Sequence, residues 1–187
     1  MLCWQNIRPN CWHNWLTTNI YSRPIMKKTQ IALLLTALIS FGLIGAALYF
    51  QIVEYMLPCP LCVIQRYAFI VTGIGSLIAL GSSELRRKIG CCIGLYGTLT
   101  GAGVALHQLY VIAHPEISCG IDPVQTAVNN MPFANWLPTV FLADGMCGTP
   151  YDPFFGLSLP QWSLLWFVVF TITLAVVLFK GKAADRN

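Results

Sequence analysis

Residues 31–50 read IALLLTALISFGLIGAALYF, an apolar stretch that contains no charged side chain. A transmembrane helix needs about 20 such residues to cross the hydrocarbon core of a bilayer, so this stretch predicts a membrane span. Three more apolar stretches follow, at about 63–80, 89–113 and 162–179. We therefore expect an all-α membrane protein whose four spans pack as a transmembrane bundle.

The overall composition agrees with a chain that is surrounded by lipid. Of 187 residues, 56% are hydrophobic and 10% are charged, whereas soluble domains carry about 25% charged residues. The formal net charge is +4. Because the positively charged residues lie at the ends of the apolar stretches, we expect the protein to have a lipid bilayer and no nucleic acid as its partner.

Lysine and arginine gather on one side of the predicted membrane. They precede the first span, separate the second from the third and follow the fourth: Arg23, Lys27, Lys28, Arg86, Arg87, Lys88, Lys180, Lys182 and Arg186. The segments 51–62 and 114–161 contain neither residue type. Because short loops rich in these residues stay in the cytoplasm, we expect both termini and the middle loop to be cytoplasmic. The other two loops are then extracytoplasmic.

The first 26 residues differ in character from the rest of the chain. They hold three tryptophans and two cysteines, without helical or strand periodicity. They are either a disordered cytoplasmic tail or an upstream extension of the reading frame, with Met26 as the natural start. The start of the first span resembles a signal peptide, but its apolar stretch is longer and three spans follow, which favours an uncleaved helix. We expect one membrane domain at 27–180 and a cytoplasmic tail at 181–187.

The eight cysteines divide by compartment. Cys3, Cys11, Cys91 and Cys92 fall on the cytoplasmic side, where thiols are normally kept reduced, so we expect them to be inert. The others fall on the oxidising side: Cys59, Cys62, Cys119 and Cys147. This division makes the outer four the candidates for redox chemistry.

Cys59 and Cys62 form a C-x-x-C motif at the outer edge of the second span. A disulfide between them closes a very small ring, which stabilises a fold little and suits a reversible redox pair. Pro58 and Pro60 favour an extended approach, so we expect the second helix to begin around Cys62 and its dipole to stabilise a thiolate there. A zinc site would need more ligands nearby, and haem attachment would need histidine in place of Val63.

Arg66 follows Cys62 by one helical turn, on the same face of the predicted helix. A cation at this position can stabilise a thiolate and polarise a neighbouring carbonyl group. The alternative is an interfacial arginine whose long side chain only reaches out to water. The residues alone leave both interpretations open.

The third span carries small residues and one histidine. Gly90 and Gly94, then Gly97 and Gly101, follow the G-x-x-x-G spacing, which predicts close contacts between helices without a chemical role. His107 stands in an otherwise charge-free stretch. A lone histidine in such a position is more often structural than functional.

Cys119 and Cys147 lie in the long, proline-rich outer loop. They can staple this loop or form a second exchangeable pair, and the C-x-x-C motif nearby favours exchange. Four outer cysteines allow three pairings, which sequence alone does not distinguish. Between them, the segment 124–137 has the pattern of a short amphipathic helix on the membrane surface, which Pro132 must interrupt.

Two groups of segments carry a family pattern. The first half has YFQ at 49–51 and LPCPLC at 57–62, followed by Arg66. The second half has WLP at 136–138, FLADGMC at 141–147 and FGLSLPQW at 155–162. Together they resemble the bacterial disulfide bond formation protein B (DsbB) family of quinone-dependent thiol oxidases. The likeness covers roughly residues 27–180, and the combination of both loops makes it specific.

The resemblance implies a four-helix bundle and a route for electrons. Members of the family oxidise DsbA, a periplasmic thioredoxin-like dithiol protein, and pass the electrons to ubiquinone or menaquinone. By position, the partner's thiolate would attack Cys119, and the released Cys147 would attack Cys59. Cys62 would then become a thiolate beside the quinone, which Arg66 would hold.

The resemblance also implies a multi-pass protein of the bacterial inner membrane with its redox cysteines on the periplasmic side. One departure is His107, which stands where relatives often carry arginine and is a weak candidate for contact with quinone. Two alternatives stay open. One is a related thiol and quinone enzyme, of the DsbI branch or similar to vitamin K epoxide reductase. The other is a non-catalytic membrane protein with structural disulfides.

Overall fold

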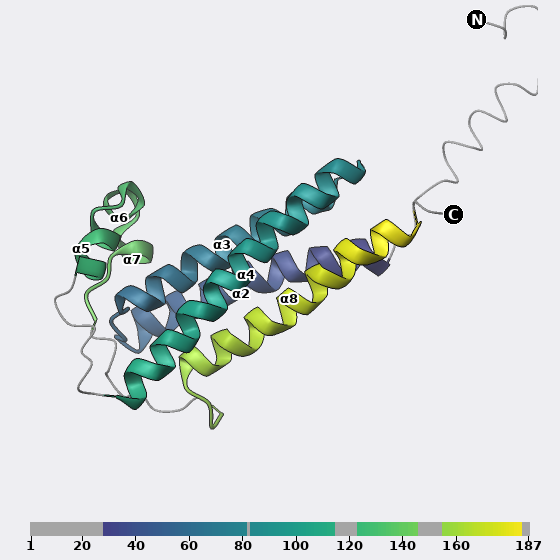
Figure 1. Cartoon of the computed structure of the whole chain (residues 1–187). Helices are drawn as coiled ribbons and strands as arrows, with labels where there is room; N and C mark the ends of the chain where they lie inside the picture. The colour runs from purple at the N-terminus through teal and green to yellow at the C-terminus, as the bar shows by residue number, and fades with distance from the viewer. Residues whose placement is uncertain (1–27, 82, 115–122, 146–154, 185–187) are drawn as a thin grey trace, which may run out of the picture.

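Four long helices run side by side and form a bundle (Figure 1). The computed structural model describes residues 28–81, 83–114, 123–145 and 155–184, with side chains as far as residue 179. The long helices are α2 (Lys28–Val53), α3 (Pro60–Ala79), α4 (Glu84–Ala113) and α8 (Leu159–Ala184). By length and composition, all four can cross a membrane. The prediction of an all-α, four-helix membrane bundle is confirmed.

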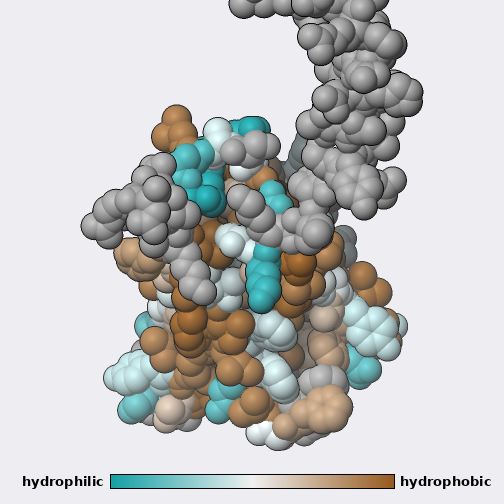
Figure 2. Space-filling view, turned by 90° about the vertical axis from the view of Figure 1, so that its right-hand side faces the viewer, coloured by the Kyte–Doolittle hydropathy of each residue, from teal (hydrophilic) through white to brown (hydrophobic). Residues whose placement is uncertain are grey.

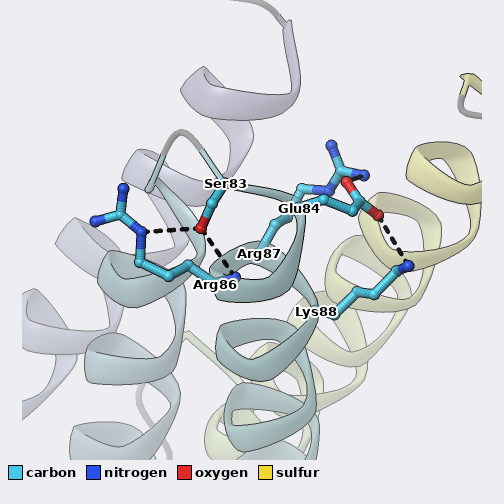
Figure 3. A network of polar contacts seen from close by, with 5 residues as sticks. All are labelled: Ser83, Glu84, Arg86, Arg87 and Lys88. Carbon is cyan, nitrogen blue, oxygen red and sulfur yellow. Dashed lines mark hydrogen bonds and ion pairs between the residues drawn. The ribbon is translucent and has the colours of Figure 1, made fainter.

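The turn between α3 and α4 illustrates how a helix starts at the polar end of the bundle (Figure 3). Ser83 is extended and caps α4, because its hydroxyl oxygen accepts hydrogen bonds from the backbone N–H of Arg86 at 3.3 Å and from Arg86 Nε at 3.1 Å. Glu84 pairs with Arg87, and with Lys88 at 3.3 Å. An acidic side chain in the first turn interacts favourably with the helix dipole. α4 therefore begins before the charge-free stretch that predicted it.

Close packing of α4 against its neighbours depends on glycines. α4 makes its most extensive contact with α3 and its next with α8, while α2 packs mainly on α3. A Cβ atom at Gly90 would overlap the backbone of α3 near Ala79. One at Gly94 would lie 2.8 Å from a methyl group of Leu174 on α8. These contacts confirm the structural role predicted for the G-x-x-x-G spacing.

The buried threonines and Ser76 inside the bundle bond to carbonyl groups of their own helix. Thr72 Oγ1 donates to the carbonyl of Ala68 at 2.8 Å, and Ser76 Oγ donates to the carbonyl of Thr72 at 2.8 Å. Side chains satisfied in this way can be buried in a membrane span. On the outer surfaces the large residues are apolar: Leu38, Leu99 and Ile172 are 59%, 61% and 60% exposed. Figure 2 shows hydrophobic residues over much of one such face, with hydrophilic patches between them.

Three short helices lie beside the end of the bundle where α3 begins (Figure 1). They are α5 (Pro123–Asn129), α6 (Pro132–Trp136) and α7 (Pro138–Phe141). The sequence predicted one short amphipathic helix interrupted at Pro132. The structure divides this segment further, because a proline lacks the N–H that an interior position needs but suits the first position of a helix. α5 and α7 pack on α3 around Val63.

Candidate active site

The C-x-x-C motif forms the first turn of α3. Cys59 has the extended angles φ −77° and ψ 160° and is the N-cap residue, and Pro60 is the first helical residue. The sequence predicted a helix start around Cys62. The start is earlier because proline restrains the residue before it to an extended conformation, and proline itself fits the first helical turn. The capping sulfur is therefore that of Cys59, which accepts a hydrogen bond from the backbone N–H of Cys62 at 3.2 Å.

This turn brings the two sulfur atoms together. Cys59 Sγ and Cys62 Sγ lie 2.7 Å apart. A small movement would bring them to the length of a disulfide bond, about 2.05 Å. Cys59 is only 3% exposed. Cys62 is half-buried and lines a cavity inside the bundle. The motif therefore has the geometry of a redox pair at the edge of a ligand-sized space.

The cavity has a volume of about 560 Å³. α2, α3 and α8 form most of its wall, and α4 and the segments that lead into α3 and α8 complete it. Most lining side chains are apolar, including Leu43, Phe69 and Trp166. The polar lining residues include Gln51, Gln65, Arg66 and Gln108, and Gln108 Nε2 lies 3.2 Å from Cys62 Sγ. An apolar cavity with a few convergent polar groups is typical of a small-molecule site.

Arg66 is buried beside this cavity, where it is 6% exposed. Its Nη1 donates a hydrogen bond to the carbonyl oxygen of Val140 in α7 at 2.7 Å. Its Nε is buried and has no hydrogen-bond partner among the described residues. A snorkelling arginine would extend its guanidinium group into water, and the observed burial is the opposite arrangement. One donor of Arg66 thus holds the loop helices, and another is enclosed without a partner among the described residues.

Gln51, near the end of α2, is a second polar residue of the wall. Its Nε2 donates to the carbonyl of Thr139 at 2.8 Å. Its Oε1 is buried without a hydrogen-bond partner among the described residues. Arg66 and Gln51 both line the cavity, and each has one buried polar atom without a partner among the described residues. Gln51 belongs to the YFQ segment at 49–51, from which no role for it could be predicted.

Sequence reasoning also missed the two glutamines next to the cysteines. Gln108 Nε2 lies 3.2 Å from Cys62 Sγ and 3.4 Å from Cys59 Sγ. Gln65 Nε2 donates to Gln108 Oε1 at 2.7 Å. The signal that could have found them is an amide in the middle of an apolar span, because polar residues there are rare and often functional. His107, which the sequence singled out, is exposed on the outer side of α4 and does not line the cavity.

The chain after α7 docks its backbone against the C-x-x-C approach. The N–H groups of Asp144 and Gly145 donate to the carbonyl of Pro58 at 3.1 and 3.0 Å. A Cβ atom at position 145 would overlap the carbonyl oxygen of Leu57, so glycine is required for this approach. Asn129 fixes the same segment by bonding both the N–H and the carbonyl of Ala143, at 2.8 and 3.0 Å. The docked segment ends two residues before position 147.

Of the six other cysteines, the structure describes two and four lie outside the described residues. Cys119 and Cys147, the second proposed redox pair, lie outside the described residues, as do Cys3 and Cys11. Cys91 is fully buried in α4, in an apolar cluster with Leu33 and Leu174, and Cys92 is exposed. The residues that the structure brings together are therefore Cys59, Cys62 and Arg66, and it adds Gln51, Gln65 and Gln108 to them.

Comparison with known proteins assigns the family. The family described as "Disulfide bond formation protein DsbB" matches residues 29–177. Disulfide bond formation protein B of Herminiimonas arsenicoxydans is 46% identical over 158 residues, which cover 84% of this chain and 100% of that protein. The protein of the same name in Cupriavidus necator is 47% identical over 153 residues, covering 82% and 94%. Disulfide bond formation protein B 1 of Pseudomonas fluorescens is 40% identical over 156 residues, covering 82% and 92%. The chain, with its C-x-x-C turn at the start of one helix of a four-helix membrane bundle, belongs to the DsbB family.

Proposed function

We propose that this protein reoxidises a periplasmic dithiol protein of the DsbA type and delivers the electrons to a membrane quinone, ubiquinone or menaquinone. The observation that carries the proposal is the Cys59–Cys62 turn at the edge of an apolar cavity that also contains the buried guanidinium of Arg66. A membrane oxidoreductase that forms disulfides needs an electron acceptor. A lipid-soluble acceptor fits a cavity that lies between membrane-spanning helices.

The residues of the cavity fit a quinone ring. Its volume of about 560 Å³ falls within the range of roughly 300–1,000 Å³ for small-molecule sites. The buried Nε of Arg66 can donate to a quinone carbonyl, and the buried Oε1 of Gln51 can accept from a quinol hydroxyl. When bound, a quinone would supply the two-electron acceptor. Arg66 and Gln51 would orient it beside Cys62.

The protein's own sulfurs move the electrons in a series of exchanges. In the first, the partner's thiolate attacks Cys119 of a Cys119–Cys147 disulfide, and Cys147 leaves as a thiolate with the electron pair of the broken bond. In the second, Cys147 attacks Cys59 Sγ of a Cys59–Cys62 disulfide. The bond between Cys59 and Cys62 breaks, and Cys62 receives its electron pair. The partner's second thiolate then attacks the partner's sulfur in the partner–Cys119 disulfide, which releases the oxidised partner and leaves Cys119 as a thiolate. Cys119 attacks Cys147 of the Cys147–Cys59 disulfide and releases Cys59, so the two electrons remain on the reduced Cys59–Cys62 pair at the cavity.

Two structural features support this order. Gly145, which precedes Cys147 by two residues in the chain, is held against Pro58, the residue before Cys59. Cys59 and Cys62 both line the cavity, so the electron pair ends on sulfurs that adjoin it. We further propose the bacterial inner membrane as the location, with both termini in the cytoplasm and the C-x-x-C end in the periplasm. The support is the cluster of Arg86, Arg87 and Lys88 at the opposite end of the bundle.

The test is a coupled assay with the purified full chain in detergent micelles, a reduced DsbA-type protein and a short-chain ubiquinone or menaquinone. We expect one quinol for each partner disulfide formed. Cys59→Ser and Cys62→Ser should abolish quinol formation, whereas Cys92→Ser, at an exposed position on α4, should retain it. Partner oxidation without quinol formation would contradict the proposal. Quinol formation with a different dithiol protein, and none with DsbA, would assign the DsbI branch instead.

The direction of electron flow has its own test. A DsbA-type partner without its resolving cysteine cannot complete the exchange, so the mixed disulfide accumulates. We expect non-reducing gels and peptide mapping to find this partner joined to Cys119. A map that joins the partner to Cys59 or Cys62 would show that the proposed order is wrong.

A further inference from the structure

Two glutamine side chains form a hydrogen-bonded pair inside the bundle, directly beside the C-x-x-C sulfurs. Gln65 and Gln108 are 5% and 4% exposed. Gln65 Nε2 donates to Gln108 Oε1 at 2.7 Å. The amide nitrogen of Gln108 is therefore turned toward the motif, 3.2 Å from Cys62 Sγ and 3.4 Å from Cys59 Sγ. The two N–H groups of one amide can serve one sulfur each.

We propose that Gln108 is a catalytic residue of the sulfur exchange and that Gln65 is the positioning residue that orients its amide. This inference deepens the proposed function and rests on it. A thiolate can only accept hydrogen bonds, so a donor must face the sulfur that becomes negative. Because Gln65 occupies Oε1 of Gln108, the carbonyl end of that amide is held away from the sulfurs and the NH₂ end faces them.

The reacting step gives this donor a defined task. The thiolate of Cys147 forms a bond to Cys59 Sγ, and the Cys59–Cys62 bond breaks. Its electron pair moves to Cys62 Sγ, and no proton is transferred. A hydrogen bond to a charged acceptor is about twice as strong as one to a neutral acceptor. Donation from Gln108 therefore stabilises the developing thiolate more than the disulfide, which accelerates the step and favours the reduced pair.

Arg66 does not replace this contribution. Its Nη1 donates to the carbonyl of Val140. The guanidinium group otherwise contributes a positive charge to the cavity wall. Gln108 is a neutral donor within hydrogen-bond distance of both sulfurs. A neutral donor can stabilise a thiolate without adding a second positive charge to the cavity wall. The two residues thus act on the same sulfur by different means.

The experiment isolates the C-x-x-C pair in the full-length chain by Cys119→Ser and Cys147→Ser. In this background we compare Gln108→Met, Gln65→Met and the double variant, because methionine has a similar shape without donors. Thr100→Val, at an exposed position on α4, is the matched polar-to-apolar control. Two quantities are measured without quinone or partner: the midpoint potential of the pair in glutathione buffers, and the rate of Cys62 alkylation by iodoacetamide at neutral pH.

We expect Gln108→Met to lower both the equilibrium constant for reduction and the alkylation rate by about tenfold, the effect of losing one hydrogen bond to a charged group. For a two-electron couple, this factor corresponds to a potential about 30 mV more negative. The double variant should match Gln108→Met, because Gln65 acts only by orienting the amide of Gln108. Gln65→Met alone should give a smaller shift in the same direction. The control should not differ from the parent.

A parent-like potential and alkylation rate in Gln108→Met and in the double variant, with normal membrane insertion, would overturn the inference and leave the amide pair a structural contact. Should the methionine variants fail to insert, Gln108→Asn keeps the amide but withdraws it from the sulfurs by one methylene, and the same shift is expected. Both readouts are independent of quinone and partner. They decide the role of Gln108 even if the coupled assay contradicts the proposed function.

Discussion

Arg66 combines two tasks in one side chain. Its Nη1 fastens α7 to α3 through the carbonyl of Val140, and its Nε is buried at the cavity without a partner among the described residues. Such a division is possible because a guanidinium group carries five donors in a rigid plane. A lysine ammonium at the same position would keep the charge without the Nε–H. The residue is therefore specific in its hydrogen bonding as well as in its charge.

This division predicts how Arg66 substitutions affect quinone kinetics. Arg66→Met should raise the apparent KM for quinone by about tenfold or more, because a hydrogen bond to the bound group is lost and such bonds contribute about 1.5–3 kcal/mol when one partner is charged. Arg66→Lys should raise it less, since the charge stays. The measurement is the quinone dependence of the coupled assay at saturating partner. Unchanged quinone kinetics in an inserted Arg66→Met protein would return Arg66 to a structural role.

Among the residues of the candidate site, some could be predicted from the sequence and others could not. Cys59, Cys62 and Arg66 follow one another within a single helical turn or two, so their proximity could be predicted from spacing alone. Gln108 lies 49 positions from Cys59 in the chain, and its approach depends on how α4 is rotated against α3. His107 and Gln108 are adjacent in sequence but point about 100° apart on a helix. The sequence drew attention to the titratable side chain of His107, whereas the packing of the helices buries the amide of Gln108 beside the sulfurs.

At the scale of elements, the segment after α7 is held by a side chain that imitates a strand partner. Asn129 bonds both the N–H and the carbonyl of Ala143, and Gln125 Nε2 adds a second bond to that carbonyl at 3.0 Å. The next residues then donate to Pro58. The sequence predicts a short interrupted helix in this region. It could not predict the docking, which consists of contacts between residues far apart in the chain.

The docking predicts a specific effect of Gly145→Ala. A Cβ atom there would overlap the carbonyl oxygen of Leu57, so the segment must shift away from the C-x-x-C approach. We expect turnover with the dithiol partner to fall by about tenfold, because misplacing reacting groups by about 1 Å can reduce rates by up to 100-fold. The redox potential of the isolated Cys59–Cys62 pair should not change.

Gly103→Ala is the matched control for this variant. Position 103 has open space around a Cβ atom, and alanine favours a helix. Its turnover should equal that of the wild type. Equal turnover in Gly145→Ala as well would mean that the docking of the segment does not limit the exchange.

At the scale of the whole molecule, the bundle has two chemically different ends. One carries the C-x-x-C turn, the cavity and the short helices α5 to α7. The other carries the α3–α4 turn, where Glu84 neutralises part of the charge of Arg87 and Lys88 and Ser83 holds Arg86 (Figure 3). The hydropathy of the sequence was sufficient to predict the spans, because apolar length alone determines what crosses a bilayer. The cavity was not predictable, because it depends on where side chains of different helices leave space.

Reporter fusions test the proposed sidedness. Alkaline phosphatase becomes active only outside the cytoplasm, so a fusion after Ser118 should be active and a fusion after Arg87 inactive. The physical reason is the absence of lysine and arginine from segments 51–62 and 114–161 and their presence at the α3–α4 turn. Expression of both fusions is measured by immunoblot as the control. The reverse activity pattern would invert the proposed orientation.

The deep burial of Cys59 determines which reductants can reach it. With 3% of its surface exposed, Cys59 offers little accessible surface to a diffusing thiol. Glutathione and similar small thiols are strong enough reductants to reduce a Cys59–Cys62 disulfide if they could reach the sulfur of Cys59. A thiol carried on the same chain meets the sulfur at a high effective concentration and needs no open approach from solvent. In the proposed relay, discrimination among reductants therefore arises from covalent tethering rather than from differences in redox potential.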